Sequence, residues 1–232
     1  KYVRTSKHLQ RIRWHGGYQG LRHSEEINCC LLSAFQESTS LKELDTELPS
    51  IGGPSNLAFG NMLANTHGLQ ALTLSFPAGL QGDLAVATAS SGLKKNTTLR
   101  ELTLEFSRGA AAISPILTSL RDHPLLRRLC LYGHVVDLTA LETMLLSDTS
   151  KITELDIHRF YGSLPIVGLT RVLQDLAPHP TLTKLGLRCV PLGCDEARLL
   201  RMALCNIPRL QSLALTDNNL GSANLAELAP AL

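Results

Sequence analysis

Leucine and other aliphatic residues recur along the chain in the spacing L-x-x-L-x-L, which fits neither a helix nor a simple alternating strand. The stretch LQSLALTDNNL at residues 210–220 shows the spacing clearly. Eight segments match this template, and they start at Leu9, Leu41, Leu69, Leu99, Leu126, Ile152, Leu182 and Leu210. The starts are 32, 28, 30, 27, 26, 30 and 28 residues apart, about 29 on average. Such a regular period predicts a stacked array of structural repeats.

A second set of aliphatic positions predicts one helix between consecutive strands. Six residues before each template start from the second onward, the chain has Phe35, Leu63, Leu93, Leu120, Leu146, Leu176 and Leu204. Helical i, i+3, i+4, i+7 spacing precedes several of them, as in Ile113, Ile116, Leu117 and Leu120, and in Leu169, Val172, Leu173 and Leu176. Pro115 and Pro165 stand where a helix can begin, and Pro124, Pro180 and Pro208 stand where it must have ended. Each unit is therefore predicted to be one short strand and one helix.

The different widths of strands and helices predict the shape of such a stack. Strands in a sheet lie about 4.8 Å apart, whereas a helix with its side chains is about 10 Å across. Stacked units must therefore bend, with strands inside and helices outside. We expect the leucines of each strand to point into the core and the residues between them to face the hollow. The predicted fold class is α/β, a solenoid with a concave parallel β-sheet and convex helices, forming one domain over residues 1–232.

The template and the asparagine of LQSLALTDNNL, Asn218, resemble the leucine-rich repeat proteins of the ribonuclease-inhibitor-like subclass. The resemblance covers about Leu9 to Leu232 and implies a horseshoe of about eight repeats. In the other units the place of the family asparagine is taken by Gly17, Pro49, Pro77, Ser107, His134, Phe160 and Val190. We therefore expect an irregular solenoid without an unbroken asparagine ladder.

Composition and the two ends of the repeat pattern limit the kinds of partner and assembly that we expect. The net charge is +2 and only 18% of the residues are charged, which implies no general attraction to nucleic acid or membranes. No apolar run approaches the roughly 18 residues of a membrane-spanning helix, so membrane insertion is not expected. Leu232 occupies the helix register and neither end has the polar cap that a solenoid needs. We expect the domain to belong to a longer array or to an assembly.

The reactive residue types form no known catalytic or metal-binding motif. The six cysteines (Cys29, Cys30, Cys130, Cys189, Cys194 and Cys205) include no C-x-x-C pair. We expect them to be reduced and structural, with Cys29, Cys30 and Cys205 as small apolar residues within helices; a Cys189–Cys194 disulfide is the alternative. Reduced cysteines favour an intracellular, cytoplasmic location.

Histidine and glycine patterns also give no sign of a cofactor or an active site. His8, His15 and His23 have no metal-binding spacing, and the glycine-rich segments lack the lysine and hydroxyl of a phosphate loop. There is no G-x-S-x-G motif. We therefore expect a protein that is not an enzyme and that has no cofactor and no metal.

Charged residues at the third, fifth and seventh template positions are the candidate binding residues, because these positions face the hollow. The candidates are Arg11, Arg13, Glu43, Asp45, Glu47, Glu101, Glu105, Arg128, Tyr132, Glu154, Asp156, His158, Lys184 and Arg188. Seven acids and five bases among them predict a mildly acidic stripe, which disfavours nucleic acid and suits a basic protein partner. The alternative is a solvated face on which charges stabilise neighbouring strands. Tyr132, flanked by Arg128, His158 and Arg188, is the favoured anchor.

These features favour a non-enzymatic recognition or scaffold module that binds a protein partner; oligomeric state is left open. Resemblance to the repeat subclass implies inhibitors, substrate receptors, sensor domains of innate-immune ATPases, or subunits of large assemblies. One alternative, also by resemblance, is a regulator similar to the Ran GTPase-activating protein, which would speed GTP hydrolysis on its partner. Another is an architectural subunit whose helices or edges, rather than its sheet, make the contacts.

Overall fold

A parallel β-sheet of eight strands runs the length of the molecule. The computed structural model describes residues 6–15, 25–47, 54–76, 80–106, 113–133, 138–158, 172, 181–190 and 192–231. The strands are β1 (Arg11–His15), β2 (Glu43–Glu47), β3 (Ala71–Phe76), β4 (Glu101–Phe106), β5 (Arg128–Gly133), β6 (Glu154–His158), β7 (Lys184–Arg188) and β8 (Ser212–Ala214). Every strand begins two residues after a template start, so the eight predicted strand positions are confirmed.

Helices connect most of these strands. In the described ranges they are α2 (Glu25–Glu37), α3 (Pro54–Asn65), α4 (Leu80–Leu93), α5 (Ser114–Leu120), α6 (Leu138–Leu145), α8 (Cys194–Leu204) and α9 (Ser222–Leu228), with a final 3₁₀ turn, η1 (Ala229–Ala231). Pro115 lies in the first turn of α5, where the sequence predicts a helix start. The helix expected around residues 164–176 lies outside the described residues except for Val172, which is helical and buried.

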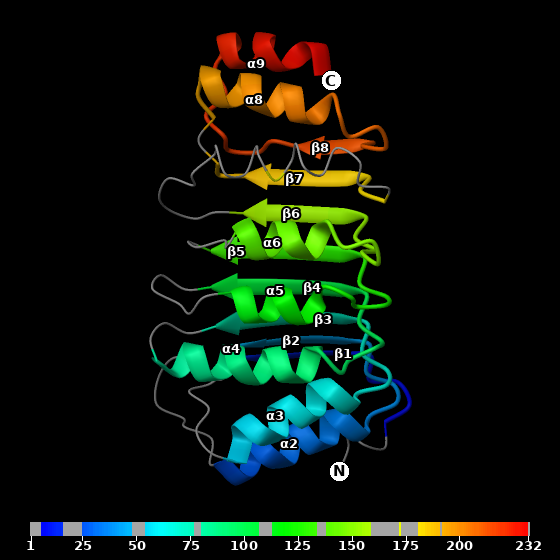
Figure 1. Ribbon diagram of the computed structural model, residues 1–232. Coiled ribbons are helices and arrows are strands. Elements are labelled where there is room, and N and C mark those ends of the chain that lie inside the picture. The colour runs from blue at the N-terminus through cyan, green and yellow to red at the C-terminus, as the bar shows by residue number, and fades with distance from the viewer. Residues whose placement is uncertain are drawn as a thin grey trace.

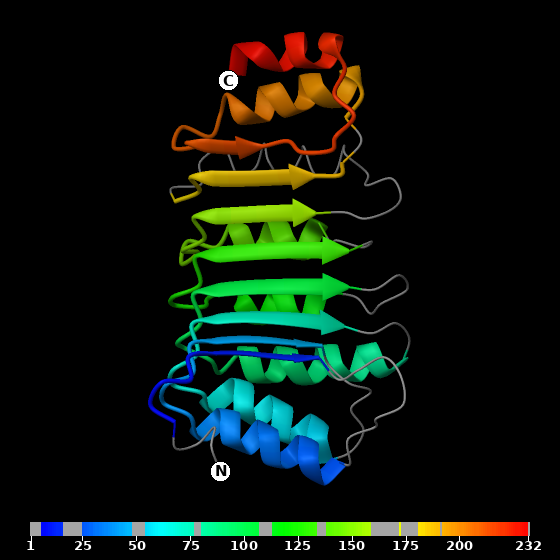
Figure 2. The same cartoon turned by 180° about the vertical axis from the view of Figure 1, so that it is seen from behind.

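The strands pair in sequence order, from β1 to β8, all parallel and in matching register. Leu44 on β2 is opposite Leu72 on β3, which is opposite Leu102 on β4, so each template position forms a row across the sheet. The helices cover one face of the sheet (Figure 1), and the strands lie in front when the molecule is turned around (Figure 2). The two termini lie at opposite ends of the stack. The result is an α/β, solenoid-like arrangement.

One continuous hydrophobic core lies between the sheet and the helices. The alternate strand positions that face it are closed to solvent, as at Leu102 and Leu104, which are both 0% exposed. Phe76 and Phe106 stack on each other with ring centroids 4.9 Å apart. Trp14 packs against this core, but it is only partly buried and lies edge-on to Phe35. The core is therefore spread along the array rather than centred.

Buried polar side chains recur just before the strands, and Asn96 among them joins two successive units. Ser38, Thr66, Asn96 and His123 each lie three residues before a template start, and all four are buried. The Asn96 amide donates to the Leu63 carbonyl (2.7 Å), and its Oδ1 accepts from the backbone N–H groups of Thr98 and Leu99 (both 3.0 Å). These bonds satisfy backbone groups that the turn would otherwise leave buried without partners.

Asn218, which the template singled out, likewise bonds to the backbone of the preceding unit, but at the carboxyl ends of the strands. Its Nδ2 donates to the Leu187 carbonyl and its Oδ1 accepts from the Val190 N–H, both at 2.7 Å. Val190 itself occupies the equivalent position in the preceding unit and is buried. The other replacements of the family asparagine (Gly17, Pro49, Pro77, Ser107, His134 and Phe160) lie outside the described residues.

Candidate functional site

The face of the sheet opposite the helices displays all fourteen candidate residues, and we call it the open face. Side chains alternate along each strand, so those between the buried leucines point away from the core. Each of the fourteen is half-buried or exposed, in contrast to the leucines beside it. Parallel pairing of the strands (Figure 2) brings equivalent residues of neighbouring strands side by side, so that they form three rows.

The row at the third template position is a chain of opposite charges. Arg11 on β1 pairs with Glu43 on β2. Further along, Arg128 lies between Glu101 and Glu154, with nitrogen–oxygen distances of 3.8 Å to each, and Lys184 donates to Glu154 at 2.7 Å. Strand register alone sets this alternation, because these positions lie directly opposite each other on β4 to β7.

The row at the fifth template position takes part in two further ion pairs, one within the row and one, between Asp156 and Arg188, that reaches diagonally to the seventh-position row. Arg13 Nε lies 2.9 Å from Asp45 Oδ2. Asp156 Oδ2 lies 3.3 Å from an Arg188 nitrogen, and the Asp156 side chain is only 15% exposed. Gly186 makes room for it, because a Cβ on Gly186 would lie 2.5 Å from Asp156 Oδ1. A small residue on β7 thus lets a carboxylate from β6 lie flat against the sheet.

Ion pairing reduces the predicted acidic stripe to a much smaller area. All five basic candidates have a carboxylate partner, and these pairs involve five of the seven acids. For the other two, Glu47 and Glu105, the described residues provide no ion pair; Glu105 instead accepts from the Ser75 hydroxyl at 2.6 Å. Excess negative charge is therefore concentrated at the carboxyl ends of β2 to β4. Each exposed pair adds only about 0–1 kcal/mol to stability.

Tyr132, His158 and Cys189 form a cluster at the carboxyl ends of β5 to β7. The Tyr132 and His158 rings meet edge to face with centroids 5.0 Å apart. His158 Nε2 lies 3.4 Å from the Cys189 sulfur. Burial raises the pKa of the Tyr132 hydroxyl, so it remains a protonated donor at neutral pH. The sequence predicted Tyr132 beside His158 but gave no sign of Cys189, which follows β7 at a backbone φ of +52°.

The cysteines and histidines elsewhere differ partly from expectation. All six cysteines are free thiols, including Cys189 and Cys194. Cys30 and Cys205 are exposed, so the prediction that they fill apolar helix positions is wrong for these two. Cys130 is buried, and burial raises the pKa of its thiol. Within the described ranges, no group of three or more histidine, cysteine or acidic side chains could hold a metal ion.

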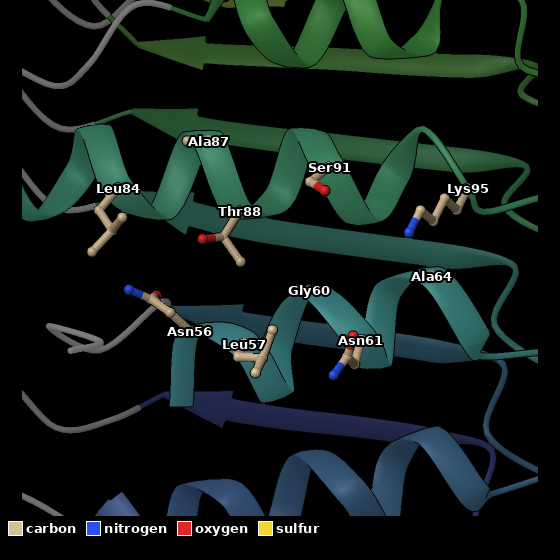
Figure 3. A pocket seen from close by; sticks show the side chains of 10 residues that line it. All are labelled: Asn56, Leu57, Gly60, Asn61, Ala64, Leu84, Ala87, Thr88, Ser91 and Lys95. Carbon is tan, nitrogen blue, oxygen red and sulfur yellow. The ribbon is translucent and has the colours of Figure 1, made fainter. Parts of the chain in front are cut away.

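A groove lies on the helix side of the molecule, between α3 and α4 (Figure 3). This groove has a volume of about 490 Å³ and is lined by Asn56, Leu57, Gly60, Asn61, Ala64, Leu84, Ala87, Thr88, Ser91 and Lys95. Leu57 and Leu84 are 69% and 50% exposed. Leu84 lies at one end of the groove, Leu57 near its middle and Lys95 at the other end (Figure 3). The sequence gave no indication of it. No helix in the described part of the chain is long and apolar enough to span a membrane.

Comparisons with known proteins do not identify the chain. No family model matches it, and no curated protein matches it. Among solved structures it is similar to a GH138 enzyme targeting pectin rhamnogalacturonan II (10% identity, TM-score 0.30, 90% of this chain and 35% of that one). It is also similar to the carboxyl transferase domain of Rhizobium etli pyruvate carboxylase (9% identity, TM-score 0.27, 93% and 40%). The chain spans about two fifths or less of these structures, and at such TM-scores neither likeness bears on its fold or activity.

Proposed function

We propose that this chain is a leucine-rich repeat protein of the ribonuclease-inhibitor-like subclass, and that it binds a protein partner through its open face without catalysing a reaction. The assignment to the repeat family is supported by eight in-register strands at a period of about 29 residues and by the bonds of Asn218 between two units. Under this proposal the open face is the concave wall of the solenoid.

The observation that carries the proposal is the set of polar and aromatic side chains held on the open face. A sheet backbone fixes their spacing, and cross-strand ion pairs restrict many of their side chains before any partner arrives. Binding to such a surface loses little conformational entropy, which leaves more of the contact energy as affinity.

The charge distribution indicates where the partner's basic groups would bind. Glu47 and Glu105 have the negative charge that the ion pairs leave over, and Tyr132 lies on the strand next to Glu105. A lysine or arginine of the partner would meet a carboxylate there without displacing an existing ion pair. Tyr132 offers a ring surface to its aliphatic portion, as aromatic residues at binding hot spots commonly do.

The test is affinity capture from native extract, followed by mass spectrometry and measurement of Kd with the purified partner. The variant Glu47→Lys/Glu105→Lys should weaken binding at least about tenfold, since two favourable charge contacts become repulsive. The matched control is Asp83→Lys/Asp148→Lys, which changes net charge equally at exposed positions away from the sheet. Equal binding by both double variants and the wild-type protein would refute the open face as the site.

An architectural role, with contacts made by the helices, is the second candidate because the α3–α4 groove exposes Leu57 and Leu84. The variant Leu57→Ser/Leu84→Ser would abolish capture in that case, while the Glu47/Glu105 variant would not. Should the captured partner be a GTPase, its rate of GTP hydrolysis with and without this chain distinguishes a scaffold from a GTPase-activating regulator.

A further inference from the structure

We propose that Cys189 is a site of thiol modification, at which the thiol reacts with low-molecular-weight disulfides while His158 takes up its proton. The two side chains come from different units, 31 positions apart, and the sulfur lies 3.4 Å from His158 Nε2. A nucleophile and a base within hydrogen-bonding reach, with the base held by a third group, is the arrangement that activates thiols. Here the third group is Tyr132, whose ring contacts the imidazole edge to face.

The backbone fixes the position of the thiol. Cys189 adopts the left-handed conformation, with φ at +52°, which non-glycine residues rarely occupy. Its N–H donates to the Thr216 carbonyl at 3.0 Å, and the next N–H, that of Val190, is held by Asn218. The loop is thus bonded to the following unit at two consecutive residues, and the Cys189 side chain points towards His158 on β6.

Charged and titratable groups from each neighbouring strand surround the pair. Strand β5 contributes Tyr132, which burial keeps protonated, and β6 contributes Asp156 beside His158. Arg188 precedes Cys189 on β7 and pairs with Asp156, so these two charges largely cancel. From the segment after β8 the contact is the backbone carbonyl of Thr216, which has no charge. His158 is therefore the basic group in direct contact with the thiol.

The reaction is a thiol–disulfide exchange that needs no reagent other than the disulfide. The Cys189 sulfur, after giving its proton to His158 Nε2, attacks one sulfur of the disulfide. A new sulfur–sulfur bond forms, the original one breaks, and the leaving thiolate takes the proton back from the imidazolium. Cys189 ends as a mixed disulfide: its sulfur gains the sulfur–sulfur bond that the departing thiol loses, so the exchange needs no further oxidant.

The other cysteines provide comparisons within the same molecule. Cys30 and Cys205 are exposed, whereas Cys189 is half-buried, so accessibility alone would make the two exposed thiols react faster than Cys189. For a free thiol with an ordinary pKa near 8.5, only about 1% is thiolate at pH 6.5. If His158 takes the proton, Cys189 should react faster than both exposed cysteines at this pH despite its lower exposure.

The experiment measures mixed-disulfide formation with glutathione disulfide at each cysteine by mass spectrometry of peptides, from pH 6 to 9. A Cys194→Ser background is used throughout, because trypsin leaves Cys189 and Cys194 on one peptide, 189–198. Serine provides a hydroxyl donor in place of the Cys194 thiol, which donates to the Asn224 side chain. The comparison is between this background, the same chain with His158→Gln, and the same chain with Tyr132→Phe.

We expect Cys189 to react at least about tenfold faster than Cys30 and Cys205 at pH 6.5, and His158→Gln to remove that advantage without changing the rates of the two exposed thiols. Tyr132→Phe keeps the aromatic ring and should preserve most of the rate advantage of Cys189. Near-unchanged circular dichroism confirms that the variants fold. If Cys189 reacts no faster than the exposed thiols, or if His158→Gln leaves its rate and pH profile unchanged, the proposal is wrong, whether or not the open face binds a protein.

Discussion

Replacing Asn96 with alanine tests the bonds between successive units. The side chain is 3% exposed and makes three hydrogen bonds to backbone groups: it donates to the Leu63 carbonyl of the preceding unit and accepts from the N–H groups of Thr98 and Leu99. Alanine removes all three and leaves these backbone groups without their partner. Leu63 and Leu99 are both 0% exposed, so water replaces the lost partner poorly.

The expected loss follows from these contacts. A buried polar group left unsatisfied costs about 1–3 kcal/mol, and the Thr98 N–H is only partly buried. We therefore expect Asn96→Ala to lower the free energy of unfolding by about 3–5 kcal/mol. In a chain of this size each kilocalorie corresponds to about 2–4 °C in Tm, so the shift should be about 10 °C.

Urea denaturation followed by two probes measures this loss. Circular dichroism reports on the whole stack, whereas fluorescence of the single tryptophan, Trp14, reports on the first strand. Because stability in repeat arrays depends on contacts between neighbours, a weakened junction between β3 and β4 should also separate the two transitions. Coincident transitions in the wild-type chain are the reference.

Two further variants isolate the cause. Asn96→Asp keeps both acceptor bonds but places a carboxylate oxygen against the Leu63 carbonyl, so it tests the loss of the donor bond together with the repulsion and burial of the new charge. Asn65→Ala removes an exposed asparagine whose amide bonds only within its own helix, and its effect should stay within about 0.5 kcal/mol. The reasoning fails if Asn96→Ala costs no more than Asn65→Ala.

Two other predictions concern helix packing and pH. Gly92→Ala places a Cβ 2.7 Å from the Gly60 carbonyl oxygen and should destabilise the fold by about 1–3 kcal/mol, although alanine has the better helix propensity. In the control, Gly60→Ala, the new Cβ meets a movable Thr88 methyl at 3.1 Å. Equal Tm values for the two variants would contradict this reasoning. Burial lowers the pKa of His123 below its usual 6.5, so the neutral form is favoured in the folded state and stability should fall as pH drops below about 6.5. His123→Asn, the residue that the preceding unit has at this position, should show a smaller loss between pH 7.5 and 5.5 in urea titrations; an unchanged difference would refute it.

The sequence by itself determined where the strands lie and which residues face the core. A leucine at position four or six of the template is buried wherever it occurs in an internal unit, because period-two alternation within a strand depends only on local backbone geometry. Register followed too: units of similar length must pair like with like, as Leu72 does with Leu102. Fourteen open-face positions could be named for the same reason.

Tertiary structure alone decided how those side chains are used. The excess of acids among the fourteen candidate residues predicted an acidic stripe. In the structure the side chains meet across strands and all five basic candidates bind carboxylates, which leaves Glu47 and Glu105 at one end of the face. Asn96 lies outside the leucine template, and only the approach of two units shows that it holds the Leu63 carbonyl. Likewise, Cys189 meets His158 because a left-handed residue after β7 turns its side chain back towards β6. Periodic burial is a local property of the chain, whereas each of these contacts depends on residues about 30 positions apart that only the stacking of units brings together.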